Sequence, residues 1–573
     1  MTIDFRNLNT VWTSVLVETL YRCGMNVAVI CPGSRSTPLA IAFARHPHID
    51  AIAILDERSA AFFALGRAKK TGLPTALVCT SGTAGVNFYP AVVEAKESSI
   101  PLIILTADRP PELRHCHAGQ TIDQIKLYGN LPNWYCELAL PEAEVGMLAY
   151  LRQNMIHAWE QSLFPIPGIV HINLPFREPL APVVQPEIAA LKTQFSTSEF
   201  FSKVDYCLSD NSNTVLPLDS WQGKSGIIIA GLAQPQDPQT YVKAIASLSK
   251  RLFFPVLAEA LSPVRNYAEL NPYLISTYDA ILRQNANVSE MMPEVVIQVG
   301  ELPTSKQLRK WLSNIAVERW IIDPRSDNFD PLHGKTIHIR SSIDRLKYSH
   351  DLDTNNNPTQ FCQRWCRLET QTRNKIDSTL ESLNTIYEGK AAWLISRSLP
   401  PGTPIFFANS MSVRNAEYFW QPNNTQIVPY FSRGANGIDG TLSTALGIAY
   451  SDRGILLTGD LALLHDTNGF LIHQKFRGHL TIVVINNNGG GIFEMLPIAD
   501  FAEFEEYFAT PQSVNIARLC AAYDVEHIKI ETWQQLKELL SNLPTSGIRV
   551  LELVCDRAVD AVWLKSNLGI FSS

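Results

Sequence analysis

The sequence lacks the features that mark membrane, secreted and nucleic-acid-binding proteins. No apolar run approaches the roughly 20 residues that a membrane-spanning helix needs. Residues 1–12 mix charged and polar side chains and contain no apolar core of a signal peptide. The formal net charge is −7, so no surplus of positive charge favours a nucleic-acid surface. We therefore expect a cytoplasmic protein with no membrane span and no nucleic-acid partner.

The cysteines are not spaced for metal binding, because no two of them form a C-x-x-C pair. Cys362 and Cys366 stand four residues apart in a predicted helix, without a set of histidines nearby. We interpret the cysteines as reduced thiols, most of them buried. The ten positions are Cys23, Cys31, Cys79, Cys116, Cys136, Cys207, Cys362, Cys366, Cys520 and Cys555.

Apolar residues, by contrast, are plentiful and regularly placed. They make up 46% of 573 residues, which is too long a chain for one hydrophobic core. Short apolar runs bounded by turn residues alternate with helical patterns, and such runs are typical of strands buried on both faces of a parallel sheet. The sequence therefore predicts an α/β protein built from doubly wound parallel sheets. In the first region the expected strands are Val27–Cys31, Ala51–Leu55, Thr75–Cys79, Leu102–Thr106 and Ile169–Asn173.

Two breaks in this alternation divide the chain into three domains of comparable size. A proline-rich stretch, 175–186, has the composition of a linker, and a polar stretch, 351–358, marks the second boundary. We predict domains at residues 1–185, 190–355 and 365–573. The strands expected in the later domains are Gly226–Gly231, Leu252–Val256, Val295–Val299, Trp320–Asp323, Ile405–Asn409, Ile427–Tyr430, Ile455–Thr458, Leu480–Asn486 and Val550–Cys555.

The strongest chemical signal is a pair of motifs in the last domain. Gly459-Asp460-Leu461 directly follows one predicted strand, and Asn487 lies 27 residues after Asp460, directly after the next strand. Because parallel strands end at the same edge of a sheet, both loops project from that edge. A carboxylate, an amide oxygen and a loop carbonyl there form an oxygen cage for Mg²⁺ or Ca²⁺. The helix between the two motifs can direct its first amides at the phosphates of a ligand.

Other strand ends carry features that are weak when taken singly. Glu57 opens a predicted helix after a strand, which is also where the helix dipole favours any acid. The turn Thr80-Ser81-Gly82 is glycine-containing but not diagnostic. Each arginine in a strand-end loop alone could be a surface ion pair, but together the set favours recognition of several carboxylates. These arginines are Arg35, Arg109, Arg414 and Arg433.

The paired motif resembles the cofactor-anchoring motif of thiamine-diphosphate enzymes. The resemblance implies that Asp460, the Asn487 side chain and the Gly489 carbonyl bind Mg²⁺, for which Mn²⁺ can substitute, and that the metal holds thiamine diphosphate. It implies that Glu57 hydrogen-bonds N1′ of the aminopyrimidine. The loop Thr80, Ser81 and Gly82 would line that ring. Leu461 stands where the family usually has a second glycine.

Longer motifs narrow the resemblance to the 2-succinyl-5-enolpyruvyl-6-hydroxy-3-cyclohexene-1-carboxylate synthases, abbreviated below to SEPHCHC synthases. They occur in the first and last domains, and matches of this length in order are specific. The resemblance implies three doubly wound domains of the thiamine-diphosphate enzyme type. The first domain would bind the pyrimidine of the cofactor, and the last would bind its diphosphate and the metal. The matching segments are 32–39, 106–113, 409–414, 433–440 and 486–497.

This family is a group of transferases of menaquinone and phylloquinone biosynthesis. They decarboxylate 2-oxoglutarate and add the succinyl carbanion to isochorismate by conjugate addition, releasing the product and CO₂. Both substrates are dicarboxylates and one carboxylate leaves, so three must be held. The resemblance also implies a homodimer or a dimer of dimers with active sites at the subunit interface.

The same resemblance assigns individual residues to the substrates. Ser410 and Arg414 would hold the distal carboxylate of 2-oxoglutarate, with Arg433 near the junction of the two substrates. The residues expected at isochorismate are Arg35, Arg109, Gln120 and Lys306, and Ser34, next to Arg35, is a further candidate catalytic residue. Those expected around the cofactor are Ile438 beneath it and Leu461, Ile492 and Phe493 beside it. Gly119 and Gln307 depart from residues that other members carry, which affects only details of isochorismate binding.

Two other functions fit parts of the pattern. Another carboligase or decarboxylase of the thiamine superfamily, such as an acetolactate synthase, would not depend on isochorismate. A non-catalytic binding protein on the same fold would be expected to have lost Glu57, Asp460 or Asn487, yet all three are present.

Overall fold

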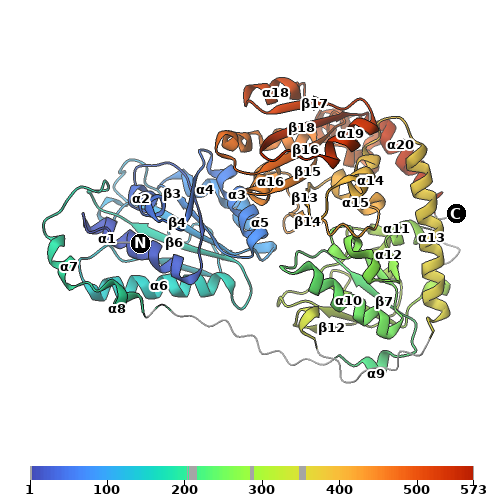
Figure 1. Cartoon of the computed structure of the whole chain (residues 1–573), viewed down its shortest axis with the longest axis horizontal. Coiled ribbons are helices and arrows are strands. Elements are labelled where there is room, and N and C mark those ends of the chain that lie inside the picture. The colour runs from blue at the N-terminus through green and yellow to red at the C-terminus, as the bar shows by residue number, and fades with distance from the viewer. Residues whose placement is uncertain (1–2, 203, 205–215, 284–288, 347–356, 572–573) are drawn as a thin grey trace. The chain divides into compact units, whose positions relative to one another are not determined.

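The computed structural model describes residues 3–202, 204, 216–283, 289–346 and 357–571. Three six-stranded sheets form the framework, and the strands within each sheet run parallel. This confirms the predicted α/β class with three doubly wound sheets (Figure 1). The predicted domain boundaries stay predictions, and the one at residue 355 lies outside the described residues, as does Cys207.

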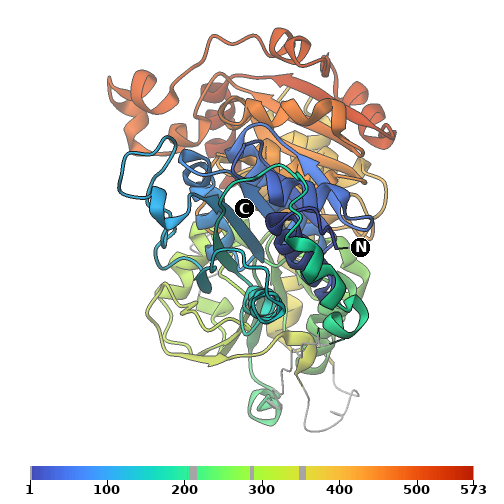
Figure 2. The same cartoon turned by 90° about the vertical axis from the view of Figure 1, so that its left-hand side faces the viewer.

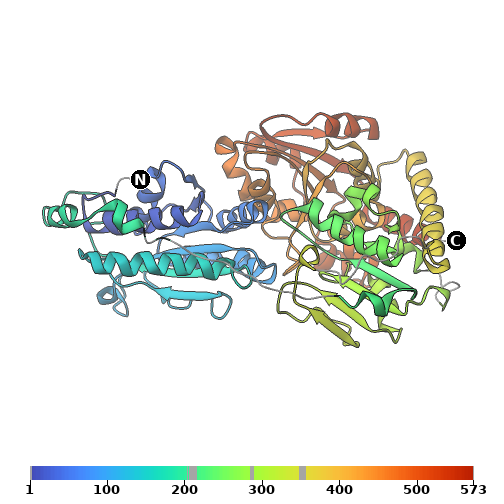
Figure 3. The ribbon, with the colours of Figure 1, turned by 60° about the horizontal axis from the view of Figure 1, so that its bottom comes forward.

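The first sheet has the strand order β2-β1-β3-β4-β6-β5. Helices α1, α2 and α6 pack over one of its faces, and α3 and α5 over the other. Figure 3 shows α6 lying along the sheet, and Figure 2 turns this part of the chain toward the viewer. The strands are β1 (Val27–Ile30), β2 (Asp50–Ala53), β3 (Thr75–Cys79), β4 (Leu102–Asp108), β5 (Trp134–Glu137) and β6 (Ile169–Pro175). The helices are α1 (Leu8–Cys23), α2 (Thr37–Arg45), α3 (Glu57–Thr71), α4 (Thr83–Asn87), α5 (Tyr89–Glu97), α6 (Val145–Leu163), α7 (Ile188–Gln194) and α8 (Thr197–Phe201).

The second sheet has a different order, β12-β11-β10-β7-β8-β9. Numbered along the chain this is the 3-2-1-4-5-6 order of dinucleotide-binding folds, with the reversal between β7 and β10. The strands are β7 (Gly226–Ala230), β8 (Val256–Ala258), β9 (Leu274–Ile275), β10 (Val295–Val299), β11 (Arg319–Ile322) and β12 (Thr336–Ile339). Its helices are α9 (Leu218–Trp221), α10 (Pro238–Leu252), α11 (Tyr278–Ile281) and α12 (Lys306–Ser313).

The third sheet, β14-β13-β15-β16-β18-β17, repeats the connectivity of the first. Its strands are β13 (Pro404–Phe407), β14 (Val428–Phe431), β15 (Arg453–Gly459), β16 (His479–Asn486), β17 (Glu526–Lys529) and β18 (Gly547–Val554). The helices of this region are α13 (Gln360–Ser382), α14 (Glu388–Ser398), α15 (Met411–Phe419), α16 (Thr441–Ala449), α17 (Asp460–His465), α18 (Ile516–Ala522), α19 (Trp533–Ser541) and α20 (Arg557–Leu568).

The structure divides into two compact units that do not follow the chain in simple order. The first unit contains residues 1–210 together with 432–450 and 465–476. The second contains 211–431, 451–464 and 477–573. Helix α16 therefore belongs to the first unit, where it packs against α3 although some 370 residues separate the two helices in sequence.

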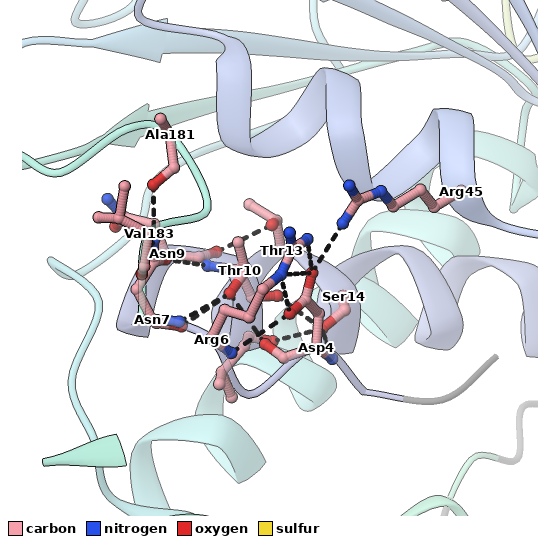
Figure 4. Close-up of polar contacts among 11 residues, drawn as sticks. Asp4, Arg6, Asn7, Asn9, Thr10, Thr13, Ser14, Arg45, Ala181 and Val183 are labelled. Atoms are coloured by element: carbon pink, nitrogen blue, oxygen red, sulfur yellow. Dashed lines mark hydrogen bonds and ion pairs between the residues drawn. The ribbon is translucent and has the colours of Figure 1, made fainter. Parts of the chain in front are cut away.

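The proline-rich stretch predicted as a linker is docked onto the start of α1 (Figure 4). The side-chain amide of Asn7 donates to the carbonyls of Ala181 and Val183, at 2.7 and 3.2 Å. The amide of Asn9 donates to the carbonyls of Arg177 and Pro179. Asn7 is also the N-cap of α1, so one residue both starts the helix and holds the distant segment. The later helices α7 and α8 pack on the same core.

One predicted strand is misplaced, and most cysteine expectations hold. Leu252 ends α10, Phe253 caps it in the left-handed region, and the strand expected at 252–256 begins only at Val256. The described cysteines are all free thiols; five are buried and Cys116 is exposed. Among the residues that the structure describes, no helix combines the length and apolarity needed to cross a membrane.

Candidate active site

The predicted metal motif lies at one edge of the third sheet. Strands β15 and β16 are neighbours, and Gly459 pairs with Ile485, so the loops after both strands leave the sheet side by side. Asp460 is the first residue of α17 and is buried, and burial raises its carboxyl pKa. Its two oxygens accept the backbone N–H groups of Leu461 and Gly489 at 2.8 and 2.9 Å. The carboxylate thus connects the two loops directly.

Asn487 presents an oxygen that suits a cation. Its Nδ2 donates to the Glu388 carboxylate at 3.0 Å, whereas its Oδ1 is buried without a hydrogen-bond partner in the described structure. A buried acceptor without a partner is costly, and a divalent cation would satisfy it. Gly489 has φ +130°, and a Cβ there would lie 2.3 Å from the Ala509 carbonyl oxygen, so only glycine fits. These features fit the Mg²⁺ ligands predicted from the sequence.

Apolar residues follow the metal loop. Ile492 and Phe493 lie in the short 3₁₀ turn Gly491–Met495. The Phe493 ring meets Phe508 edge to face, with centroids 5.7 Å apart, and Ile492 packs on the core of the second unit. Leu461 follows Asp460 in α17 and is partly exposed. All three side chains are therefore available at the edge of this loop to contact a ligand.

Glu57 lies where the sequence predicts it, at the first position of α3 after β2. Asp56 caps the helix by accepting the Ser59 N–H at 3.0 Å. The Glu57 side chain is half-buried and takes no part in this capping bond. Burial raises the pKa of the Cys31 and Cys79 thiols, and the negative charge of Glu57 raises both values further. Glu57 therefore lies near the carboxyl ends of β1 and β3, where a ligand of this sheet would bind.

Four of the predicted residues in the first unit contact one another. Arg109 donates to Ser81 Oγ, and Ser81 Oγ donates to the Gln120 carbonyl at 3.1 Å. Gln120 Nε2 returns a bond to the Ser81 carbonyl at 2.9 Å. Gly82, next to Ser81, has φ +87° and lies against the Gln120 side chain. Two loops that are distant in sequence are thus joined at the ends of β3 and β4.

Arg35 brings a second guanidinium to this edge. It lies in the loop between β1 and α2, beside the exposed Ser34, and donates to the Phe176 carbonyl at 2.9 Å. Burial and then the neighbouring charge of Arg109 lower the pKa of Arg35, and Glu178 and Asp108 only partly oppose this. Arg35 also forms an ion pair with the exposed Glu178 carboxylate at 3.5 Å. The adjacent guanidinium groups of Arg35 and Arg109 could together bind the carboxylate of a ligand. Thr80 packs against the backbone of this loop at Gly33.

The residues predicted at 2-oxoglutarate lie at the start of α15 in the second unit. Ser410 has φ +66° and precedes the helix, and its carbonyl accepts a bond from Arg414 at 2.6 Å. Burial lowers the pKa of the Arg414 guanidinium, whereas the charge of Glu259 raises it. Glu259 also accepts the Thr304 N–H at 2.8 Å, and this loop leads to Lys306, whose exposed side chain begins α12. Arg414 and the Lys306 loop therefore approach the same buried carboxylate.

Arg433 and Ile438 belong to the first unit, in the segment before α16. The Glu94 carboxylate fixes this segment by accepting the backbone N–H groups of Gly434 and Ala435, at 3.2 and 2.7 Å. The Ile438 carbonyl accepts a hydrogen bond from the Thr441 hydroxyl at 2.8 Å. The Ile438 side chain is partly exposed. The geometry is that of a short rigid loop carrying one cation and one bulky apolar side chain.

The predicted site residues thus fall into two sets, and their catalytic roles stay predictions. The first unit holds Ser34, Arg35, Glu57, Thr80, Ser81, Gly82, Arg109, Gln120, Arg433 and Ile438. The second holds Lys306, Ser410, Arg414, Asp460, Leu461, Asn487, Gly489, Ile492 and Phe493.

Sequence reasoning missed two buried residues that support these sets. Gln124 accepts the Gly82 N–H at 3.0 Å and donates to Asn173, so it holds the loop after β3. Glu388 accepts the Asn487 amide. Neither residue belongs to a recognisable motif, and each partner lies far along the chain, so no local pattern could have revealed them.

Comparisons with known proteins agree with this arrangement. Three family profiles match: the N-terminal TPP binding domain of thiamine pyrophosphate enzymes at residues 12–127, the middle domain at 198–407 and the C-terminal TPP binding domain at 410–552. Thiamine pyrophosphate is the same compound as thiamine diphosphate. The benzoylformate decarboxylase structure from Polynucleobacter necessarius has a TM-score of 0.64 over 95% of this chain and 98% of that chain. At 15% identity this likeness concerns the fold alone.

Much closer relatives are found over the full length. The 2-succinyl-5-enolpyruvyl-6-hydroxy-3-cyclohexene-1-carboxylate synthase of Gloeothece citriformis is 62% identical, with 100% of both chains covered. The synthase of the same name from Rippkaea orientalis is 60% identical over 99% of this chain and 97% of its own. That of Trichodesmium erythraeum is 58% identical over the whole of both chains. The chain therefore belongs to the thiamine-diphosphate enzymes and, within them, to the SEPHCHC synthase family.

Proposed function

We propose that this chain catalyses the SEPHCHC synthase reaction. In that reaction 2-oxoglutarate loses CO₂ and its remaining four-carbon unit is joined to the ring alkene of isochorismate. The observation that carries the proposal is the pairing of a cation cradle with separate guanidinium groups, Arg414 in one unit and the Arg35–Arg109 pair in the other. A decarboxylase of 2-oxo acids with neutral tails would not need these cations. The pathway we infer is menaquinone or phylloquinone biosynthesis.

Thiamine diphosphate and Mg²⁺ would be held at the edge of the third sheet. Asp460, Asn487 Oδ1 and the Gly489 carbonyl would ligate the cation, and the first amides of α17 would face the diphosphate. When bound, the cofactor supplies the carbon that attacks the keto group and accepts the electrons released by decarboxylation. Ile438, Leu461, Ile492 and Phe493 would surround it. Mn²⁺ would substitute for Mg²⁺.

Glu57 would hold a proton at N1′ of the aminopyrimidine. Its place at the start of α3, outside the capping bond made by Asp56, leaves the carboxyl group available for this contact. The buried turn Thr80-Ser81-Gly82 at the end of the neighbouring β3 would line the ring. The side chain of Glu57 thus acts on the cofactor and not on either substrate.

The substrate carboxylates would be divided between the arginines. Ser410 and Arg414 would hold the distal carboxylate of 2-oxoglutarate, in a partly buried setting where a charge-assisted hydrogen bond is stronger than in water. Arg35, Arg109 and Gln120 would hold isochorismate together with Ser34 and Lys306. Of these, Arg109 is joined through the Ser81 hydroxyl to Gln120. Arg433 would lie near the junction of the two substrates. Such clamps orient the two reactants for carbon–carbon bond formation.

We further propose that the active enzyme is a cytoplasmic homodimer or a dimer of such dimers. The described cysteines are free thiols, which fits a reducing compartment. Glu57 and Asp460 belong to different units of the chain, and an isologous dimer would bring a Glu57 from one subunit to the metal loop of the other. Each dimer would then contain two equivalent sites.

One assay tests the proposed activity. The purified chain, thiamine diphosphate, Mg²⁺ and labelled 2-oxoglutarate should release labelled CO₂ rapidly only when isochorismate is added. Equal release without isochorismate would indicate a simple decarboxylase, and pyruvate as the preferred donor would indicate an acetolactate-type carboligase. Detection of the succinylated ring product by mass spectrometry completes the test.

A further inference from the structure

The buried carboxyl group of Glu388 lies beside the predicted metal loop, and none of the functions proposed above uses it. Glu388 is the first residue of α14 and is only 6% exposed. Its backbone N–H donates to Asp560 at 3.0 Å, which fixes the start of the helix. Its side chain accepts hydrogen bonds from two amides, those of Asn487 and Asn415. A buried acid with this many partners has one defined orientation.

The bond to Asn487 selects which end of that amide faces the loop. A carboxamide has a donor end and an acceptor end, and a divalent cation binds only the oxygen. Because Glu388 accepts from Nδ2 at 3.0 Å, Oδ1 must point away from Glu388, and it is buried without a partner. Turning the amide over would place Oδ1 against a carboxylate oxygen, which is repulsive. Glu388 thus holds the orientation that a cation requires.

The two residues after Asn487 are restrained by other partners. Arg557 donates to the Asn488 carbonyl, and the Gly489 N–H donates to Asp460 at 2.9 Å. Both of these bonds hold backbone atoms, so they place the loop without affecting the Asn487 side chain. Within the described parts of the chain, only the hydrogen bond that Asn487 Nδ2 donates to Glu388 distinguishes the two ends of the amide.

The surroundings of Glu388 do not form a second cation site. Glu388, Cys555 and Asp560 lie together, with one ligand atom of each within 4.8 Å of the others. However, Asp560 already accepts the Glu388 N–H, and the Cys555 thiol is hydrogen-bonded to Asp560. These bonds indicate that Asp560 and Cys555 hold the start of α14, and with it Glu388, in place.

We propose that Glu388 is a positioning residue for the cofactor's cation: it holds the Asn487 carboxamide with Oδ1 presented to Mg²⁺. This inference rests on the cation site of the proposed function. Partners of metal ligands typically change metal affinity by about 10- to 100-fold when they are removed.

Two conservative variants test whether Glu388 orients the Asn487 amide. Glu388→Gln has the same reach, but one end of its carboxamide is a donor and can hold the reversed Asn487 amide, whereas Glu388→Asp stays an acceptor but withdraws the oxygen by one methylene. If Glu388 orients Asn487, both variants should weaken Mg²⁺ binding, by about 10-fold or more. Unchanged Mg²⁺ affinity in either folded variant would overturn the proposal.

The measurement is a calorimetric Mg²⁺ titration of the full chain at saturating thiamine diphosphate, so it does not depend on activity. Glu369→Gln is the matched control, since the Glu369 carboxylate on α13 also accepts hydrogen bonds in partly buried surroundings, from Ser276 and Thr277. It should leave Mg²⁺ affinity unchanged. Thermal unfolding of each variant identifies those that do not fold, and the Gln and Asp variants provide two independent chances of a folded protein.

A double-mutant cycle with Asn487→Ala distinguishes positioning from general destabilisation. Once the Asn487 amide is gone, Glu388→Asp should cause almost no further loss of Mg²⁺ affinity, because it has nothing left to orient. Additive losses would overturn the proposal. If Asp460→Ala and Asn487→Ala both leave Mg²⁺ binding intact, the cation site itself is wrong and both proposals fail. If they weaken it and Glu388→Asp does not, only the role of Glu388 fails.

Discussion

Gly66 on α3 and Gly447 on α16 lie at the crossing point of the two helices. A Cβ on Gly66 would come within 2.1 Å of the Thr444 carbonyl oxygen and 3.0 Å of the Gly447 Cα. A Cβ on Gly447 would lie 2.2 Å from the Phe63 carbonyl oxygen. Because each helix presents only hydrogen where the other approaches, the backbones contact directly. This contact joins α16 to the helix that begins with Glu57.

Gly66→Ala should therefore destabilise the chain by about 1–3 kcal/mol, since the added methyl group meets backbone that cannot move aside. Helical glycine-to-alanine changes at open positions instead stabilise by about 0.4–1 kcal/mol. Gly146→Ala on α6 is the matched control, because a Cβ at Gly146 would meet no heavy atom within 4 Å. Denaturant unfolding followed by circular dichroism measures both. Equal midpoints for the two variants would contradict the close crossing.

Replacing single arginines should raise the KM for one substrate much more than the KM for the other. Arg414→Ala should raise the KM for 2-oxoglutarate far more than that for isochorismate, and Arg109→Ala should do the reverse. Loss of a charge-assisted bidentate contact costs about 2–4 kcal/mol, or about 30- to 1000-fold in kcat/KM. Steady-state kinetics with each substrate varied in turn gives the four constants. Equal effects on both substrates by either variant would assign that arginine a structural role.

Mixing two inactive variants tests whether the active site is shared between subunits. Glu57→Ala and Asp460→Ala, unfolded together and refolded, form mixed dimers about half of the time. In a shared arrangement each mixed dimer has one site with both lesions and one with neither, so about a quarter of normal activity should return. If each site is built within one chain, every site stays damaged. Native mass spectrometry confirms that mixed dimers have formed.

The buried His171 should make the N-terminal unit sensitive to acid. His171 on β6 is fully buried, and burial lowers its pKa to about 3, from about 6.5 when unfolded. Between these values the unfolded chain binds a proton that the folded chain does not, so stability is lost as pH falls. At pH 5 the expected loss is about 2 kcal/mol.

The variant His171→Gln keeps a hydrogen-bonding group toward Thr106, which lies 2.9 Å from the His171 ring, but cannot titrate. Its unfolding temperature should fall less between pH 7 and pH 5 than that of the original chain. His157→Gln on α6, where the ring is 44% exposed, is the control and should follow the original chain. A parallel fall in both variants would contradict this account.

The sequence alone determined the α/β class and most of the central strands. Strands such as β3, β4 and β16 are buried on both faces, so their apolar runs are continuous and easily read. The strands that sequence reasoning missed are β5, β9, β12 and β17, and all four lie at sheet edges. An edge strand is short and partly exposed, so it needs no continuous apolar run.

The motifs that contain the candidate site residues could also be predicted from the sequence, because each is a short segment at the end of one strand. Glu57, Asp460 and Asn487 could be found this way, since strand and helix signals on either side fix their places. Glu388 could not, because its function depends on an amide 99 residues away.

Only the tertiary structure decided which segments share a unit. Residues 432–450 and 465–476 lie between strands of the third sheet in sequence, and both belong to the first unit. The close approach of Gly66 to Gly447 and the docking of 177–185 onto Asn7 and Asn9 are likewise contacts between distant segments. A local pattern records which face of an element is apolar, but the identity of the partner depends on the shapes of both surfaces. That information exists only once the chain has folded.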